Sequence, residues 1–103
     1  MAVLDKSKSS VKWNVFLSRR VEKNKKSLPD PVRAALLALT KDISENGPVR
    51  GNWPNYSSLS GTKHHCHLKK RGRPTYVAVW EVIDNEVRIV EVTYAGTREN
   101  APY

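Results

Sequence analysis

The strongest constraint on this chain is a pair of apolar segments separated by a short polar turn. The segments are residues 75–83 (TYVAVWEVI) and 88–94 (RIVEVTY), and both are rich in the β-branched and aromatic side chains that favour strands. Asp84, Asn85 and Glu86 lie between them and have the composition of a tight turn. We therefore expect an antiparallel hairpin, which needs a further layer of structure to cover its apolar face.

Two other segments have the alternation of a strand. In residues 11–17, apolar side chains occupy every second position, a period that is typical of a half-buried strand. These side chains are Val11, Trp13, Val15 and Leu17. Residues 63–70 also alternate, and Gly72 and Pro74 then bend the chain back toward the hairpin. The sequence thus predicts four strands in all.

The middle of the chain predicts a long helix. Residues 30–46 repeat apolar side chains at the period of a helix that buries one face. Asp30 is expected to cap the helix, with Pro31 at its first position, where a missing N–H costs nothing. Gly47 and Pro48 are expected to end it. The apolar stripe consists of Val32, Ala35, Leu36, Leu39 and Ile43.

A shorter helix is predicted before the long one, from a cap at Ser18 to about Leu28. The element order is then β-α-α-β-β-β. This order predicts an α+β fold, in which an antiparallel sheet has an N-terminal helical hairpin packed on one face. Residues 49–60 are rich in turn formers and are expected to form a connecting loop. Three side chains are expected to hold that loop to the core: Trp53, Tyr56 and Leu59.

Size and composition exclude several classes of protein. With 103 residues, the chain is expected to form one domain (residues 1–103), with the polar residues 1–10 disordered. No apolar run reaches the roughly 18 residues of a membrane span, and none resembles a signal peptide. Cys66 is the only cysteine, so no disulfide can form within the chain, which fits a reducing cytoplasm.

The charge balance points to an anionic partner. Eighteen Lys and Arg residues against ten Asp and Glu residues give a formal net charge of +8. Such an excess informs about partners rather than about the fold. Nucleic acid is the first candidate partner, and an acidic protein is the second.

The positive charge is most concentrated in residues 61–73. These thirteen residues contain five Lys or Arg residues, all three histidines and no carboxylate. In a strand, Lys63, His65, His67 and Lys69 would share one face, and His64, Cys66 and Leu68 would share the other, more apolar one. Two imidazoles flanked by cations on an open face would suit a phosphate backbone and proton transfer. The plainer alternative is a solvated polar strand face.

A metal site in this segment is disfavoured. His65 and His67 would point the same way, a geometry that zinc sites use, but catalytic zinc needs a third protein ligand. Cys66 would face the other side of the sheet, and the neighbouring cations would repel a dication. We expect no metal and no other cofactor.

The remaining candidates lie in the last strands and the tail. Arg98 offers a fixed fork for a phosphate, and Tyr103 offers a ring for stacking and a hydroxyl for proton transfer. The alternative is a frayed tail. Glu81 and Glu91 could form a paired acid site, or could instead pair with Lys63, Lys69 or Arg88 across the sheet. Three aromatic residues are expected to be core residues: Trp13, Tyr76 and Trp80.

Three pieces of the chain, taken in order, resemble the RelE/ParE toxin superfamily, in particular its RelE- and HigB-like members. They are residues 65–68 (HCHL), 74–82 (PTYVAVWEV) and 91–103 (EVTYAGTRENAPY). The helix that follows Leu28 and Pro29 fits as well, so the resemblance covers about residues 12–103.

The resemblance implies the toxin component of a type II toxin–antitoxin system. Such a toxin is a cytoplasmic, metal-independent mRNA endonuclease that acts at the ribosome and represses translation. The implied partners are a cognate antitoxin, which holds the toxin inactive in a hetero-oligomer, together with the ribosome and mRNA.

The resemblance also implies residue roles. Arg98 would stabilise charge on the phosphate, His65 and His67 would transfer protons, and Tyr103 would stack or transfer a proton. Arg73 would replace a cation that relatives carry where this chain has Val77. The residues implied in RNA binding are Lys63, Lys69, Lys70, Arg71 and Arg73.

Two other functions remain open at this stage. A ParE-like toxin would inhibit DNA gyrase by binding it, and would leave the histidines without a role. A nucleic-acid-binding module without toxicity would show strongly salt-dependent binding and no effect on growth.

Overall fold

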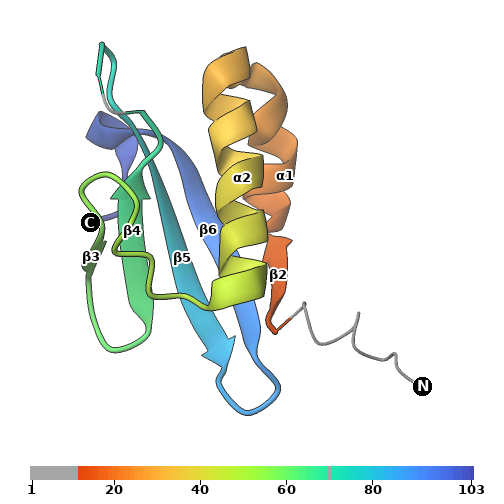
Figure 1. The fold of residues 1–103 in the computed structure, drawn as a ribbon. Helices are drawn as coiled ribbons and strands as arrows, with labels where there is room; N and C mark the ends of the chain where they lie inside the picture. The colour runs from red at the N-terminus through yellow and green to blue at the C-terminus, as the bar shows by residue number, and fades with distance from the viewer. Residues whose placement is uncertain (1–11, 70) are drawn as a thin grey trace.

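The computed structural model describes residues 12–69 and 71–103. Two α-helices and five strands follow one another in the order β2-α1-α2-β3-β4-β5-β6 (Figure 1). Short 3-10 helices follow α1 and β6. The expected disorder of residues 1–10 falls outside the described residues, as do Val11 and Lys70.

The strands form one mixed sheet in the order β2-β6-β5-β4-β3. Neighbouring strands from β3 to β6 are antiparallel, and β5 (Tyr76–Asp84) and β6 (Ile89–Thr97) form the predicted hairpin. The α+β prediction is confirmed. A wholly antiparallel sheet was wrong, because β2 (Asn14–Leu17) pairs with β6 in parallel. The helices that connect β2 to the rest allow this direction, which a tight hairpin could not.

The strands differ from the prediction most clearly at β4, at the end of β6 and in the presence of β3. β4 spans Lys63–His67 and ends before Lys69. β6 continues to Thr97, three residues past its predicted end. The segment predicted to be a loop contains the short edge strand β3 (Ser57–Ser58), which pairs with β4. Two serines have little strand preference of their own, so this pairing depends on β4 rather than on local sequence.

Helix α1 (Arg19–Asn24) begins as the sequence predicts. The Val21 N–H donates to Ser18 Oγ at 3.1 Å, so Ser18 is the cap. The 3-10 helix Lys25–Ser27 extends the turn to Leu28.

Helix α2 (Asp30–Asn46) begins one residue earlier than predicted. Pro29 occupies the capping position, and Asp30 is the first helical residue, so the predicted Asp30 cap was wrong. The Asp30 carboxylate instead pairs with Arg33, one turn along the helix. Gly47 ends the helix as predicted, at a φ of 95° that favours glycine. No helix within the described ranges is long and apolar enough to cross a membrane.

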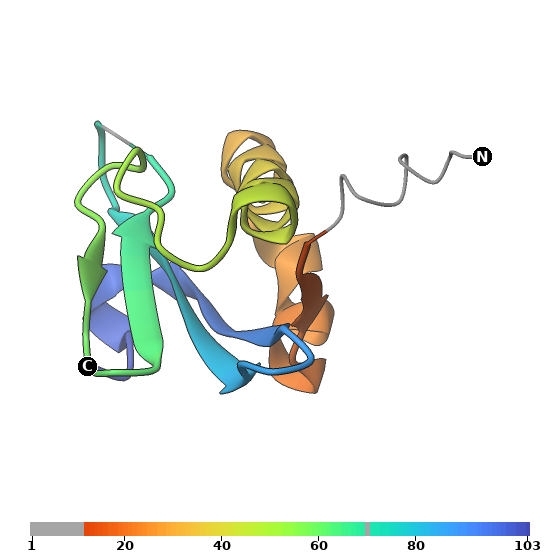
Figure 2. The same cartoon turned by 60° about the horizontal axis from the view of Figure 1, so that its bottom comes forward.

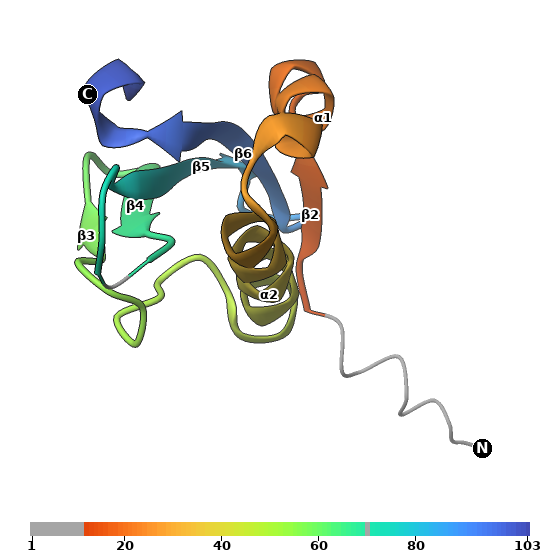
Figure 3. The ribbon, with the colours of Figure 1, turned by 90° about the horizontal axis from the view of Figure 1, so that it is seen from above.

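The two helices and one face of the sheet enclose the main core. Figure 3 shows α2 lying across this face and α1 beside the β2–β6 end of the sheet. The helical part of the chain contributes Val21, Leu28, Val32, Leu36, Leu39 and Ile43. The sheet contributes Cys66, Leu68, Ala78, Trp80, Val90, Val92 and Ala95. Trp13 and Tyr76 pack against this core, and Trp80 is wholly buried, so all three aromatic predictions are confirmed.

The face of the sheet opposite α2, called here the open face, carries a smaller apolar cluster. Val77, Val79 and Tyr94 form it, and Leu59 and Ala101 cover it. The C-terminal segment therefore lies over the open face, and the C-terminus is beside β3 and β4 (Figure 2). Of the three predicted loop anchors, Trp53 and Tyr56 pack on the main core, whereas Leu59 packs on this cluster.

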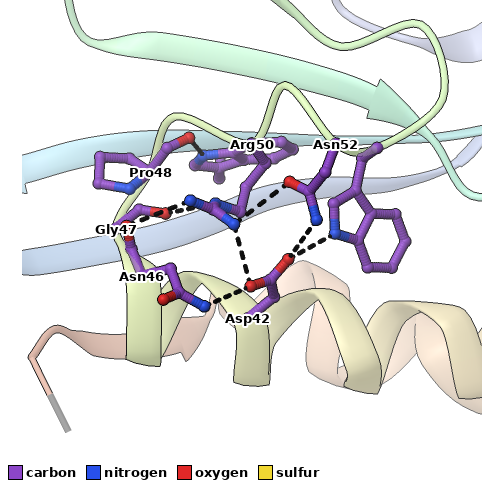
Figure 4. A network of polar contacts seen from close by, with 8 residues as sticks. Asp42, Asn46, Gly47, Pro48, Arg50 and Asn52 are labelled. Carbon is purple, nitrogen blue, oxygen red and sulfur yellow. Dashed lines mark hydrogen bonds and ion pairs between the residues drawn. The ribbon is translucent and has the colours of Figure 1, made fainter. Parts of the chain in front are cut away.

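A polar network fixes the loop that follows α2 (Figure 4). The Asp42 carboxylate accepts hydrogen bonds from the Trp53 indole at 2.8 Å and from the Arg50 guanidinium at 3.0 Å. It also accepts from the side-chain amides of Asn46 and Asn52. Burial alone would raise the pKa of Asp42, but these four donors outweigh burial and hold its pKa well below the usual range.

Replacing Asp42 with alanine is therefore expected to lower the free energy of unfolding at pH 7 by about 2–3 kcal/mol, since four donors lose a charged acceptor. Because the folded-state pKa is depressed, this stabilisation is present above about pH 4 and is lost as the pH falls further. Urea unfolding at pH 7 and pH 3 measures both effects. Glu45→Ala, which removes an exposed pair with Lys41 on the same helix, should change stability little. An equal loss for both variants would contradict this role.

Candidate active site

Strand β4 divides its side chains between the two faces as predicted. His64 and Cys66 are buried toward the main core, with exposed fractions of 6% and 0%. Lys63 is exposed, and His65 and His67 are half-buried. The alternation of a strand therefore places His65 and His67 together on the open face.

His65 is held from two sides. Its Nδ1 lies 3.0 Å from the Ser57 hydroxyl of β3, and its ring centroid lies 4.7 Å from that of Tyr103. The His67 ring is 6.4 Å away on the same strand, at an interplanar angle of 61°. The phenol of the C-terminal residue thus meets two imidazoles of β4.

The C-terminal segment is anchored rather than frayed. The Arg98 N–H donates to the Thr75 carbonyl at 2.8 Å, and the 3-10 helix Arg98–Asn100 follows directly. Ala101 then donates to the Arg98 carbonyl at 3.1 Å and packs on the open-face cluster. These contacts bring Tyr103 back onto β4.

Gly96 has a steric role in this arrangement. It lies within β6 and pairs with Val77. The Tyr94 hydroxyl donates to the Thr97 carbonyl at 2.6 Å, and its ring lies against Gly96. A Cβ on Gly96 would approach the Tyr94 hydroxyl oxygen to 2.8 Å. Glycine therefore allows Tyr94 to hold the start of the segment that carries Arg98.

The local electrostatics shift two side chains in opposite directions. Burial, and then the neighbouring His65 and Arg98, lower the pKa of His67. Burial raises the pKa of Tyr103, and Arg98 only partly opposes that increase. At neutral pH, His67 is therefore a neutral base and Tyr103 keeps its proton. The charge of Arg98 acts on both groups.

Arg98 also lines a hollow of about 720 Å³, large enough for a nucleotide. Arg73 lies on the same hollow, together with Pro74, Thr75 and Glu99. Two arginines therefore line one space, whereas Val77 is fully buried.

The predicted cations that follow His67 in the chain lie outside strand β4. Lys69 lies beyond the end of β4, with its Nζ 5.7 Å from the ring centroid of Tyr76, which packs on the main core. The prediction that Lys69 shares a strand face with His65 was wrong, because the strand ends before it. Arg71 is exposed in the loop that follows, and Lys70 lies outside the described residues.

The third histidine belongs to the core. His64 Nδ1 lies 2.7 Å from the Tyr56 hydroxyl, and its ring stacks on Trp80 with centroids 5.9 Å apart. Burial lowers the pKa of His64 and raises that of the neighbouring Cys66 thiol to about 12. Both groups are therefore uncharged structural residues.

Glu81 and Glu91 are direct cross-strand neighbours on the open face. Within residues 12–69 and 71–103, neither forms the predicted ion pair with Lys63, Lys69 or Arg88, although Lys63 is the cross-strand neighbour of Glu81. Nor does the described part of the chain contain a cluster of three or more metal-ligating side chains.

Sequence reasoning missed two residues near the site. Ser57 belongs to an edge strand that has no local strand signal. Arg20 lies on α1, yet its guanidinium carbon is 6.0 Å from the ring centroid of Tyr94 on the open face. Its helical position gave no indication that it would reach the sheet.

Sequence comparisons give no match, neither to a family model nor to a curated protein. Solved structures do match. A mutant of the E. coli toxin RelE in the free state superposes with a TM-score of 0.63 at 19% identity, covering 86% of each chain. The fold is that of the RelE toxins. An archaeal RelE–RelB complex from Pyrococcus horikoshii also matches, with a TM-score of 0.62 at 15% identity, covering 86% of this chain and 98% of that one. The RelE-like fold inferred from the sequence is confirmed.

Proposed function

We propose that this protein is the toxin of a toxin–antitoxin pair and that it cleaves mRNA on the ribosome, with side chains rather than a metal ion promoting the reaction. The observation that carries the proposal is the meeting of His65, His67 and Tyr103 on the open face of a RelE-like fold. Arg98 begins the C-terminal segment that brings Tyr103 to this place, and its charge acts on both His67 and Tyr103.

The reaction uses the ribose hydroxyl that distinguishes RNA from DNA. The 2′-oxygen attacks the adjacent phosphorus, and the bond from phosphorus to the 5′-oxygen breaks. The products are a 2′,3′-cyclic phosphate and a 5′-hydroxyl. One proton leaves the 2′-hydroxyl and one is delivered to the 5′-oxygen, so the reaction needs one base and one acid.

His67 is assigned as the base and Tyr103 as the acid. The pKa of His67 is lowered and that of Tyr103 is raised, and groups whose environments separate their pKa values in this way suit opposite roles. His65 lies between them, with its ring against Tyr103 and its Nδ1 on Ser57. Its ring contact positions the phenol.

Arg98 is assigned to the charge that builds up on the phosphate. A preplaced cation at such a charge is usually the largest single contribution to catalysis. Arg73, on the same hollow, would bind the neighbouring RNA phosphate. The exposed Lys63 and Arg71 would add nonspecific electrostatic attraction for the RNA backbone.

The net charge of +8 fits both proposed partners. The ribosome and mRNA are polyanions, and an acidic antitoxin could cover the same cationic face. The matched archaeal RelE was solved with RelB, which supports a protein partner for this chain.

Expression of the chain without an antitoxin tests the proposal. We expect growth arrest, together with new 5′-ends inside translated transcripts that primer extension will detect. The cuts should disappear when translation of the reporter message is blocked by removing its start codon. Growth arrest with intact transcripts and broken DNA would favour a toxin that inhibits gyrase. Normal growth at good expression of the protein would favour a nucleic-acid-binding module without toxicity.

A further inference from the structure

Arg20 is a cation on the open face to which the proposed chemistry gives no role. Its guanidinium carbon lies 6.0 Å from the ring centroid of Tyr94, within the open-face apolar cluster. The side chain is exposed. Among the described residues, no carboxylate lies within ion-pair distance of it.

Arg20 lines a second hollow, of about 510 Å³, next to the catalytic residues. Tyr103, Lys63 and Glu81 line the same hollow, and its remaining lining includes Ser60 and Thr93. Tyr103 also contacts His65, so its ring, which is 51% exposed, borders both the catalytic residues and this second space.

The cations around this hollow are not equivalent. Lys63 is the direct cross-strand neighbour of Glu81, so part of its charge is offset. The Glu81 carboxylate accepts a hydrogen bond from Thr62 Oγ1 at 3.4 Å, and it would repel a phosphate on its own side of the hollow. Arg20 shares the hollow with Glu81 but forms no ion pair with it or with any other described carboxylate. It also borders a polar hollow lined by Asn24, Ser27 and Asn100. An anion in this region would therefore bind at Arg20.

We infer that Arg20 binds a backbone phosphate of single-stranded RNA at a subsite in the hollow that it shares with Tyr103, apart from the Arg73–Arg98 hollow. This inference rests on the proposed function and extends it. The strand crosses the open face, with one nucleotide stacked at Tyr103 and a phosphate on each side of it. The substrate is thus a single strand several nucleotides long, because a duplex would not let a base reach the ring.

Binding of short RNA strands tests the subsite. The probes are a trinucleotide and a hexanucleotide of 2′-O-methyl RNA, which cannot be cleaved because the attacking hydroxyl is blocked. Fluorescence anisotropy at several salt concentrations gives the affinity and its salt slope. Arg20→Gln is compared with Arg19→Gln, which removes the same charge from the neighbouring exposed position of α1. Glutamine keeps the helix propensity, and thermal unfolding checks the fold of each variant.

We expect Arg20→Gln to weaken hexanucleotide binding about three- to tenfold and to reduce the salt slope by about 0.7, the value for one phosphate contact on a single strand. Trinucleotide binding should stay unchanged, and Arg19→Gln should affect neither probe. Equal effects of Arg20→Gln and Arg19→Gln, with binding by the unaltered protein intact, would overturn the subsite alone. No binding of either probe by the unaltered protein at low salt would overturn both the subsite and the proposed function.

Discussion

Replacing Arg98 with alanine is expected to slow mRNA cleavage by about 10²–10³-fold without unfolding the protein. The guanidinium is exposed, and the contact that anchors this segment uses the backbone N–H of Arg98, which alanine retains. The loss should therefore arise from the missing charge at the phosphate. Single-turnover cleavage on ribosomes programmed with a defined message measures it.

Two controls make this result specific. Arg19→Ala removes an exposed arginine from α1 and should leave the rate unchanged. Arg98→Lys keeps the charge but cannot form a bidentate hydrogen bond to the phosphate, so an intermediate rate is expected. If Arg98→Ala cleaves as fast as the unaltered protein, Arg98 does not stabilise the reacting phosphate.

Replacing His67 with glutamine is expected to slow cleavage by about 10²-fold and to change its pH dependence. In the unaltered protein the base must be neutral, and the pKa of His67 is lowered by burial and by the neighbouring His65 and Arg98. The rate should therefore rise with pH through a value below the ordinary imidazole pKa of about 6.5, and should be level above it. Glutamine removes the titrating group, so this acidic limb should disappear.

Tyr103→Phe is the matched control for the pH profile. It removes one hydroxyl and keeps the ring that contacts His65. The variant should be slower but should retain the acidic limb, because His67 is still present. Rate–pH profiles of the three proteins between pH 5 and pH 8 separate the two roles. An acidic limb that persists in His67→Gln would show that another group is the base.

The elements that local sequence specifies were the ones that could be predicted. The long helix, the β5–β6 hairpin and the alternation of β4 follow from short-range patterns, and each is present. The parallel β2–β6 pairing and the Ser57–Ser58 strand depend on contacts between distant segments. Because such pairing is chosen by the whole sheet rather than by local preference, no single segment revealed it.

The site was predictable to a similar extent. Alternation alone placed His65 and His67 on one face, whereas the roles of Arg98 and Tyr103 came from a family resemblance. Lys69 was misplaced because nothing in the sequence marked the early end of β4. The position of Arg20 near the open face was not predicted, because it depends on how α1 packs beside β6. Local sequence does not specify that packing.

Cleavage of a message in which one ribose lacks its 2′-hydroxyl tests the proposed reaction most directly. Primer extension first locates the cut on a programmed ribosome, and the nucleotide before that cut is then replaced by its 2′-deoxy form. We expect the unmodified message to give a 2′,3′-cyclic phosphate and a 5′-hydroxyl, and the modified message to stay intact at that site. Equal cleavage of both messages would contradict the claim that the open face promotes attack by the ribose hydroxyl.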